Sequence, residues 1–224
     1  MDINLNNQIE MKLKFRFILL LLVACNLFCG ITLTPKIYFG TNFSRNDYSD
    51  NFKVEKHCYH PGFIFGFSNQ IKLNNTFFIQ NDIYYDYQHS KTLLGNHGLW
   101  GSIYHNYFVN YLRVSVLFGY RLPKQFYLLC GPDIGKIIGD VRLKLTHDFH
   151  TFEEYSENVT NIFPAYDISL CIGFGKEIQI KNKSFQCEIK YYISFTDYNF
   201  KSNWSGLKED YINHRLSLIF GFLI

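Results

Sequence analysis

The segment of residues 106–139 alternates apolar and polar side chains with a period of two. In its first half Leu112 and Val114 fall on one face, and Arg113 falls on the other. Alternation of this kind predicts a β-strand with one apolar face. Proline and polar residues interrupt the pattern at residues 122–125, so the segment predicts two strands joined by a very short turn.

The same pattern recurs along the chain and predicts an all-β fold of eight strands. We expect these strands at residues 37–44, 62–71, 76–88, 106–121, 126–139, 164–178, 184–197 and 212–224. The connections alternate in length: they are long at 45–60, 89–104, 140–162 and 198–210, and short at 72–75, 122–125 and 180–183. We expect the third long connection to begin as an extension of the fifth strand. This parity is typical of an antiparallel up-and-down transmembrane β-barrel with four external loops, three tight periplasmic turns and both termini in the periplasm.

The alternation alone leaves two orientations open. A membrane barrel turns its apolar faces to lipid and its polar faces to the lumen. A soluble lipocalin-like barrel has the opposite arrangement and binds an apolar ligand inside. Glycines on several polar faces and the parity of the connections favour the membrane barrel.

Three stretches stand out as a group: Tyr111–Val116, Gly119–Tyr120 and Leu129–Pro132. They resemble the mid-chain signature of the PorT-like outer-membrane β-barrel family, and a weaker likeness runs from Pro35 to Ile224. Members of that family usually carry Glu and Pro where this chain has Arg113 and Ser115. The resemblance implies a porin-family barrel in the outer membrane of a Gram-negative bacterium. It also implies an accessory role in secretion, because PorT itself is associated with the secretion and maturation of exported proteases.

The polar strand faces predict a charged lumen. Nine charged residues fall on these faces: Asp82, Asp86, Arg113, Arg121, Asp133, Asp167, Glu188, Lys190 and Arg215. Five acids nearly balance four bases, and an eight-stranded barrel is just wide enough for side chains to fill. We therefore expect a salt-bridged plug, with a proton or solute pathway as the sharper alternative.

The amino terminus predicts export. Three basic residues between positions 12 and 16 precede the apolar run Phe17–Ala24, which is the layout of a secretory signal. We assign residues 1–30 to this signal segment, with Met11 as an alternative start, and residues 31–224 to the barrel domain. Leu22–Cys25 matches a lipoprotein box, so acylation of Cys25 and ordinary cleavage between Ala24 and Gly30 both stay open.

Composition narrows the class further. Among the 224 residues, aromatic side chains reach 19%, which suits the aromatic girdles of a membrane barrel. A formal charge of +3 without a basic cluster does not indicate a nucleic-acid partner. Beyond the amino terminus no run of eighteen apolar residues predicts a membrane-spanning helix. The partners expected are outer-membrane lipid, the barrel-assembly machinery and components of a secretion system.

Candidate chemistry is sparse. His57, Cys58 and His60 could offer three metal ligands in the first long connection, but incidental loop residues explain them better. His147 and His150 form a second weak cluster. No GxSxG, HExxH or phosphate-binding glycine motif occurs, so we predict no catalytic residues and no cofactor. A barrel enzyme with its site at the external rim remains the alternative.

Loop position alone nominates four aromatic residues for binding: Tyr48, Trp100, Tyr155 and Trp204. The cysteines do not build a disulfide framework, because Cys130 and Cys187 are predicted to face lipid while Cys171 faces the lumen. The sequence therefore predicts a non-enzymatic outer-membrane barrel. Its external loops would serve binding, adhesion or accessory roles in secretion and assembly.

Overall fold

The computed structural model describes residues 33–48, 56–96, 102–147, 156–160, 163–181, 183–196, 200–201, 208–209 and 211–223. The chain divides into two units, residues 1–33 and 34–224, and the second unit contains the barrel. The predicted signal segment, with Met11 and Cys25, lies outside the described residues.

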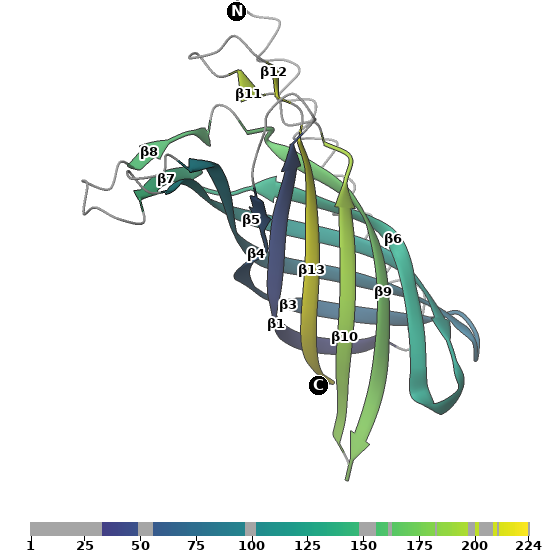
Figure 1. Cartoon of the computed structure of the whole chain (residues 1–224). Coiled ribbons are helices and arrows are strands. Elements are labelled where there is room, and N and C mark those ends of the chain that lie inside the picture. Colours follow the sequence, from purple (N-terminus) through teal and green to yellow (C-terminus); the bar gives the residue numbers. More distant parts are fainter. Residues whose placement is uncertain are drawn as a thin grey trace, which may run out of the picture. The chain divides into compact units, whose positions relative to one another are not determined.

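Eight long strands close into an antiparallel up-and-down barrel (Figure 1), which confirms the predicted fold. They are β1 (Leu33–Tyr48), β3 (His60–Lys72), β4 (Phe77–Asn96), β5 (Ser102–Arg121), β6 (Phe126–Ile137), β9 (Tyr166–Ile180), β10 (Lys183–Ser194) and β13 (Tyr211–Leu223). Each strand pairs with its neighbour along this series. The first and last strands close the ring in a continuous register from Lys36 opposite Leu223 to Tyr48 opposite Tyr211.

The three predicted tight turns lie together at one end of the barrel, which we call the turn end. In the first turn, Oδ1 of Asn74 accepts hydrogen bonds from the backbone N–H groups of Thr76 and Phe77. The second is a 3-10 turn, η2 (Pro123–Gln125), in which Lys124 adopts a positive φ of 59°. β1 begins and β13 ends at this same end, because the strands run antiparallel.

The opposite end, which we call the loop end, carries more strand than the alternation predicts. β4 continues to Asn96 and β5 begins at Ser102, so the prediction of a loop was wrong for residues 89–96 and 102–104. Backbone pairing persists there although the side chains lose their apolar alternation, and the register shifts once between Leu93 and Gly95.

Short strands widen the barrel wall at the loop end into a sheet. β2 (Lys56–Cys58) pairs with β4, β7 (Arg142–His147) pairs with β5, and β8 (Ser156–Asn158) pairs with β7. β7 resumes on β5 where β6 stops, which confirms the expected extension of the fifth strand. We call these short strands, with residues 89–96 of β4 and 102–108 of β5, the loop-end sheet. In the fourth long connection β11 (Phe200–Lys201) pairs with β12 (Lys208–Glu209).

The outer face of the barrel is apolar and solvent-accessible. Side chains such as Phe67, Phe118 and Ile172 are 58%, 51% and 51% exposed, and they alternate with buried polar residues. The lipocalin-like alternative requires apolar side chains inside, so this arrangement overturns it. No helix formed by the described residues is long and apolar enough to cross a membrane.

Aromatic side chains gather in two outer belts. The turn-end belt comprises Phe77, Phe118, Tyr120, Phe126, Phe174, Phe185 and Phe222, with ring centroids 4.9 to 5.3 Å apart in its contacting pairs. The loop-end belt comprises Phe63, Tyr85 and Tyr87, where Phe63 lies 5.5 Å from Tyr85 and 5.2 Å from Tyr87. Between the belts the outer face of β5 is apolar from Leu112 onward.

Candidate functional site in the barrel interior

Arg113 of β5 is the centre of the charged interior. Its Nε lies 2.7 Å from Asp86 of β4, its Nη1 lies 2.7 Å from Asp133 of β6, and its Nη2 lies 2.5 Å from Asp167 of β9. The arginine is only 1% exposed. A planar guanidinium presents donors in a fixed fork, so one side chain can bind carboxylates from three strands.

A second arginine reaches two of these carboxylates from the opposite wall. Arg215 of β13 forms an ion pair with Asp86, and its Nη2 lies 3.3 Å from Asp133. The same Nη2 donates to the hydroxyl of Tyr84 at 2.9 Å. The two guanidiniums therefore link β4, β5, β6, β9 and β13 across the lumen.

Neutral donors saturate these carboxylates further. Asp133 accepts hydrogen bonds from Tyr84 at 2.6 Å and Ser115 at 2.7 Å. Asp86 accepts from Gln88 at 2.7 Å, and Asp167 accepts from Ser194 at 2.5 Å. A buried ion pair is tolerated only when its remaining lone pairs are satisfied in this way. The hydrogen bonds to these carboxylates are therefore satisfied within the protein, which indicates a structural role for the cluster.

Nearer the turn end Lys190 holds a second ionic cluster. Its Nζ lies 2.7 Å from Asp82 and 2.8 Å from Glu188, and Tyr127 donates to Glu188 at 2.7 Å. Beside this cluster, Lys36 donates to Gln186 at 2.5 Å. A cavity of about 10 Å³ lined partly by Lys36 and Glu188 is only large enough for a single water molecule.

Arg121 differs from the other eight predicted lumen residues. They are buried, whereas the side chain of Arg121 is 31% exposed at the turn-end rim. It lies 3.4 Å from Glu177 and takes no part in the two inner clusters. Arg121 is on the inward face of β5. Because it is the last residue of the strand, its side chain reaches the mouth of the barrel.

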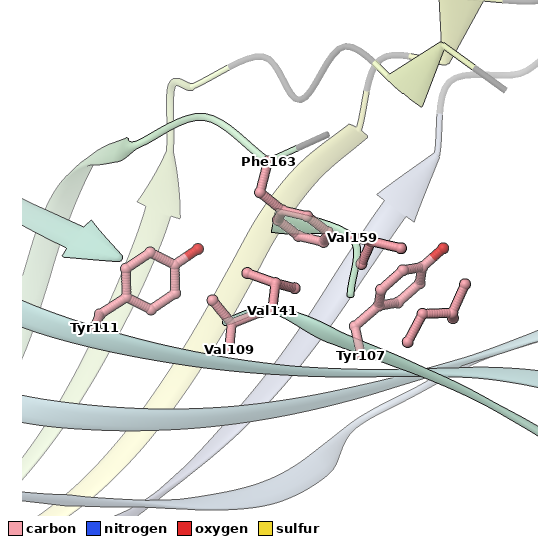
Figure 2. Packing of buried hydrophobic residues seen from close by; sticks show 7 residues of the cluster. Tyr107, Val109, Tyr111, Val141, Val159 and Phe163 are labelled. Carbon is pink, nitrogen blue, oxygen red and sulfur yellow. The ribbon is translucent and has the colours of Figure 1, made fainter. Parts of the chain in front are cut away.

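Packed apolar side chains occupy the barrel on both sides of the charged layer. Phe78, Leu117, Tyr127, Leu129, Cys171 and Tyr192 form the turn-end cluster. Tyr107, Val109, Tyr111, Val141, Leu143, Val159 and Phe163 form the loop-end cluster. Figure 2 shows Phe163 above Val141 and Val159 above the ring of Tyr107, and the ring of Phe163 lies 5.7 Å from that of Tyr107.

The loop-end cluster sits directly on the charged layer. Tyr111 is the inward residue that precedes Arg113 on β5, and the guanidinium of Arg113 lies 4.4 Å from the centre of its ring. The segment that carries Val159 is held by backbone bonding, because its N–H donates to the carbonyl of Val141 at 2.9 Å. Charged and apolar clusters therefore occupy the described interior towards both ends of the barrel.

The predicted loop residues are only partly described. Tyr48 ends β1, His57 and Cys58 lie on β2, and His147 ends β7, each described for its backbone alone. Trp100, Tyr155, Trp204 and His150 lie outside the described residues. Among the side chains that the structure does describe, no group of three or more His, Cys, Asp or Glu residues could hold a metal ion.

His60, the third weak metal candidate, instead contacts His89. Their ring centroids lie 4.7 Å apart, and His89 stacks on Phe108 at 4.5 Å. Nε2 of His89 also lies 3.2 Å from Oδ1 of Asn106. Both histidines lie just beyond the loop-end belt. Burial lowers the pKa of His60 below 6.5, and the adjacent His89 lowers it further.

The cysteines take the faces that alternation indicates. Cys130 is exposed on the outer face, Cys187 is half-buried and Cys171 is buried in the interior. All three are free thiols.

Two charged residues of the interior escaped the sequence analysis. Lys36 is 2% exposed and points inward, but the first strand was predicted to start one residue later. Glu177 pairs with Arg121 near the predicted end of the sixth strand. Extending the alternation of Tyr38, Gly40 and Asn42 backwards would have found Lys36.

Comparison with known proteins gives structural likeness only. No protein-family model matches the chain, and no curated protein matches it in sequence. Ail, the attachment invasion locus protein of Yersinia pestis, in complex with the heparin analogue sucrose octasulfate, matches with 16% identity and a TM-score of 0.42, over 87% of this chain and all of Ail.

Two further solved barrels are similar. Neisserial surface protein A matches with 8% identity and a TM-score of 0.45, over 86% of this chain and 99% of that protein. OprG, an outer-membrane protein from Pseudomonas aeruginosa, matches with 10% identity and a TM-score of 0.40, over 87% of this chain and 97% of OprG.

Proposed function

We propose that the chain is an integral outer-membrane β-barrel with a sealed interior. It presents the loop-end sheet and its loops for binding and does no catalysis. One observation carries the proposal: the exposed outer face is apolar while the buried inner face is charged. A soluble barrel would have the opposite arrangement, because an exposed apolar surface this large is unfavourable in a soluble monomer. Lipid around the barrel accounts for both faces at once.

The dimensions of the outer face support membrane insertion. On β5 the apolar outer face runs from Leu112 to Tyr120, which matches the ~9–11 residues that a tilted strand needs to cross a bilayer. The two aromatic belts lie towards the ends of this band, as they do where rings meet the membrane interface. β4 and β5 have 20 residues each, so both strands extend well beyond the membrane at the loop end.

The filled interior favours binding over transport. Two guanidiniums and their carboxylates fill the lumen, and packed apolar clusters lie on both sides of them. A solute would have to break several buried ion pairs to pass. The proposal therefore excludes a constitutive pore and assigns function to the surfaces outside the membrane.

The loop-end sheet is the surface best built for a partner. Its strands continue the barrel wall, and the side chains of Val141, Val159 and Phe163 pack on those of β5. A rigid scaffold of this kind can position binding loops. We place the predicted aromatic loop residues Tyr48, Trp100, Tyr155 and Trp204 in this role. More specifically, we propose a PorT-like accessory role, in which these loops contact components of a secretion system or of the barrel-assembly machinery.

Electrophoresis of the detergent-extracted membrane fraction tests insertion. A closed barrel resists detergent, so the unboiled protein should run at a different apparent mass from the boiled protein. Recovery in the soluble fraction with no shift on boiling would refute the proposal.

Cysteine labelling tests topology. In a background without native cysteines, Asp140→Cys places a thiol in the exposed connection before β7, and Leu73→Cys places one in an exposed turn. An impermeant maleimide should label Asp140→Cys on intact cells and Leu73→Cys only after lysis. The reverse pattern would put the loop-end sheet in the periplasm and remove the proposed binding role outside the cell.

A further inference from the structure

The turn end carries a ring of exposed lysines. Lys72 lies in the first turn, Lys124 in the second, and Lys176, Lys181 and Lys183 belong to the β9–β10 hairpin. All five side chains are exposed. Glu177 is the only carboxylate side chain near them in the described residues 71–77, 119–128, 175–181 and 183–185. It is half-buried and accepts hydrogen bonds from Arg121 and Gln186, so it does not offset the ring.

The lysines lie beside the turn-end belt. Nζ of Lys176 is 4.8 Å from the centre of the Phe126 ring, which itself stacks on Phe174 at 5.3 Å. An outward lysine next to aromatic rings is placed where the headgroups of a bilayer begin. Lys176 therefore has the position expected of a lysine that meets lipid phosphates.

The tip of the β9–β10 hairpin carries both apolar and basic side chains, a combination that suits the membrane–water interface. Ile178 and Ile180 are 39% and 54% exposed on its outer face, between Lys176 and the turn lysines. Figure 1 shows this hairpin reaching beyond the end of β13. Apolar side chains flanked by lysines can enter the boundary between headgroups and acyl chains while the ammonium groups contact phosphate.

We propose that the turn end binds the phosphate headgroups of anionic phospholipids in the membrane leaflet that surrounds it. Charge complementarity decides the partner, because five exposed cations have no unpaired carboxylate side chain beside them in the described turn-end residues. Lysines near a charged membrane surface each attract anionic lipid, and their effects combine. The inference rests on the proposed function, since it requires the barrel to be inserted.

Tryptophan quenching by brominated lipids tests the inference in reconstituted full-length barrels. With Trp100 and Trp204 replaced by Phe, two reporters are placed on the outer face of β9. Phe174→Trp lies at the turn end beside Lys176, and Ile168→Trp lies towards the loop end. Each reporter is measured twice in mixed vesicles, once with brominated phosphatidylglycerol and once with brominated phosphatidylcholine. The ratio of quenching gives the headgroup preference at each level.

Phe174→Trp should show a preference for phosphatidylglycerol of about fivefold, while Ile168→Trp should show a ratio near one. Half-molar salt should lower the first ratio towards one, because it screens exposed charges. Neutralising the ring should do the same, with Gln at positions 72, 176 and 183 and Asn at 124 and 181, where φ is positive. A matched control, Lys136→Gln with Arg142→Gln, removes exposed charge near the loop end and should leave the ratio unchanged.

The outcomes separate the two proposals. If brominated lipids of both kinds fail to quench both reporters, the barrel is not in the bilayer and the proposed function fails. If both reporters are quenched but Phe174→Trp shows equal quenching by the two headgroups, the barrel is inserted and the lipid inference alone is overturned. A preference that survives neutralisation of the five lysines would also overturn it.

Discussion

Arg113 lies directly opposite Gly135 in the register of β5 and β6, and its guanidinium occupies the space where a side chain at position 135 would begin. A Cβ on Gly135 would lie 2.9 Å from Cζ and Nη1 of Arg113. The glycine therefore leaves room for the arginine to reach its three aspartates. The absence of a side chain at position 135 and the position of the Arg113 guanidinium therefore depend on each other.

Gly135→Ala should destabilise the barrel because the guanidinium cannot move without breaking ion pairs to Asp86, Asp133 and Asp167. We expect a loss of roughly 1–3 kcal/mol, the usual cost of overpacking. The measurement is the temperature at which the unboiled electrophoretic form disappears. Gly221→Ala is the matched control, since its Cβ would meet its nearest atom at 3.6 Å and should leave that temperature unchanged. Equal behaviour of the two variants would contradict the fitted arrangement.

Arg113→Met should be far more damaging than Arg121→Met. Removing Arg113 takes the cation from Asp167 and leaves Asp86 and Asp133 with Arg215 alone, and breaking a buried pair costs roughly 3–5 kcal/mol. Arg121 is 31% exposed, and a pair at the surface contributes only about 0–1 kcal/mol. Urea unfolding in detergent micelles, followed by circular dichroism, compares the two. Similar losses in both variants would mean that the inner cluster is not the main electrostatic support of the barrel.

Period-two alternation was enough to predict the barrel and the inward face of the charged residues that it singled out, although it missed Lys36 and Glu177. The alternation could not predict which charged side chains form ion pairs with each other. Arg113 and Asp167 lie on β5 and β9, which are separated by β6, so their contact depends on how far each strand is staggered around the ring. A linear sequence does not display that stagger.

The loop end was harder to predict for a different reason. From Ser90 to Asn96 the strand leaves the apolar band, and its side chains lose the alternation that marks a strand. Hydrogen bonding between backbones keeps the pairing with β5 regardless of side-chain polarity. The loop-end cluster was missed likewise, because Val141, Val159 and Phe163 lie far apart in the sequence from the β5 residues on which they pack.

Phe163→Ala should loosen the loop-end sheet without opening the barrel. The ring is 8% exposed and packs on Tyr107, so its removal should cost about 3–5 kcal/mol locally. Limited proteolysis followed by mass spectrometry should then show faster cleavage within residues 138–165, while the shift on boiling persists. Arg142→Ala, on the exposed side of β7, should match the unmodified protein. Loss of the boiling shift in Phe163→Ala would show that the loop-end cluster supports the whole barrel.

Acid should weaken the contact between His60 and His89. Burial lowers the pKa of both imidazoles below the usual 6.5 in the folded protein, and the nearby Lys91 acts in the same direction. A histidine whose folded pKa is lowered stabilises the fold above the unfolded pKa and loses that contribution as the pH falls. The loop-end sheet should therefore become more open to hydrogen exchange as the pH drops below 6.5.

Proton-detected NMR titration in micelles checks the histidine contact residue by residue. Both imidazoles should titrate below 6.5, and His89→Asn should raise the pKa of His60 because it removes a neighbouring positive charge at low pH. Asn106→Leu should lower the pKa of His89 further, because the hydrogen bond to the side chain of Asn106 favours the charged imidazole. A pKa at or above 6.5 for either histidine in the unmodified protein would contradict the partly buried contact, because burial disfavours the charged form of an imidazole.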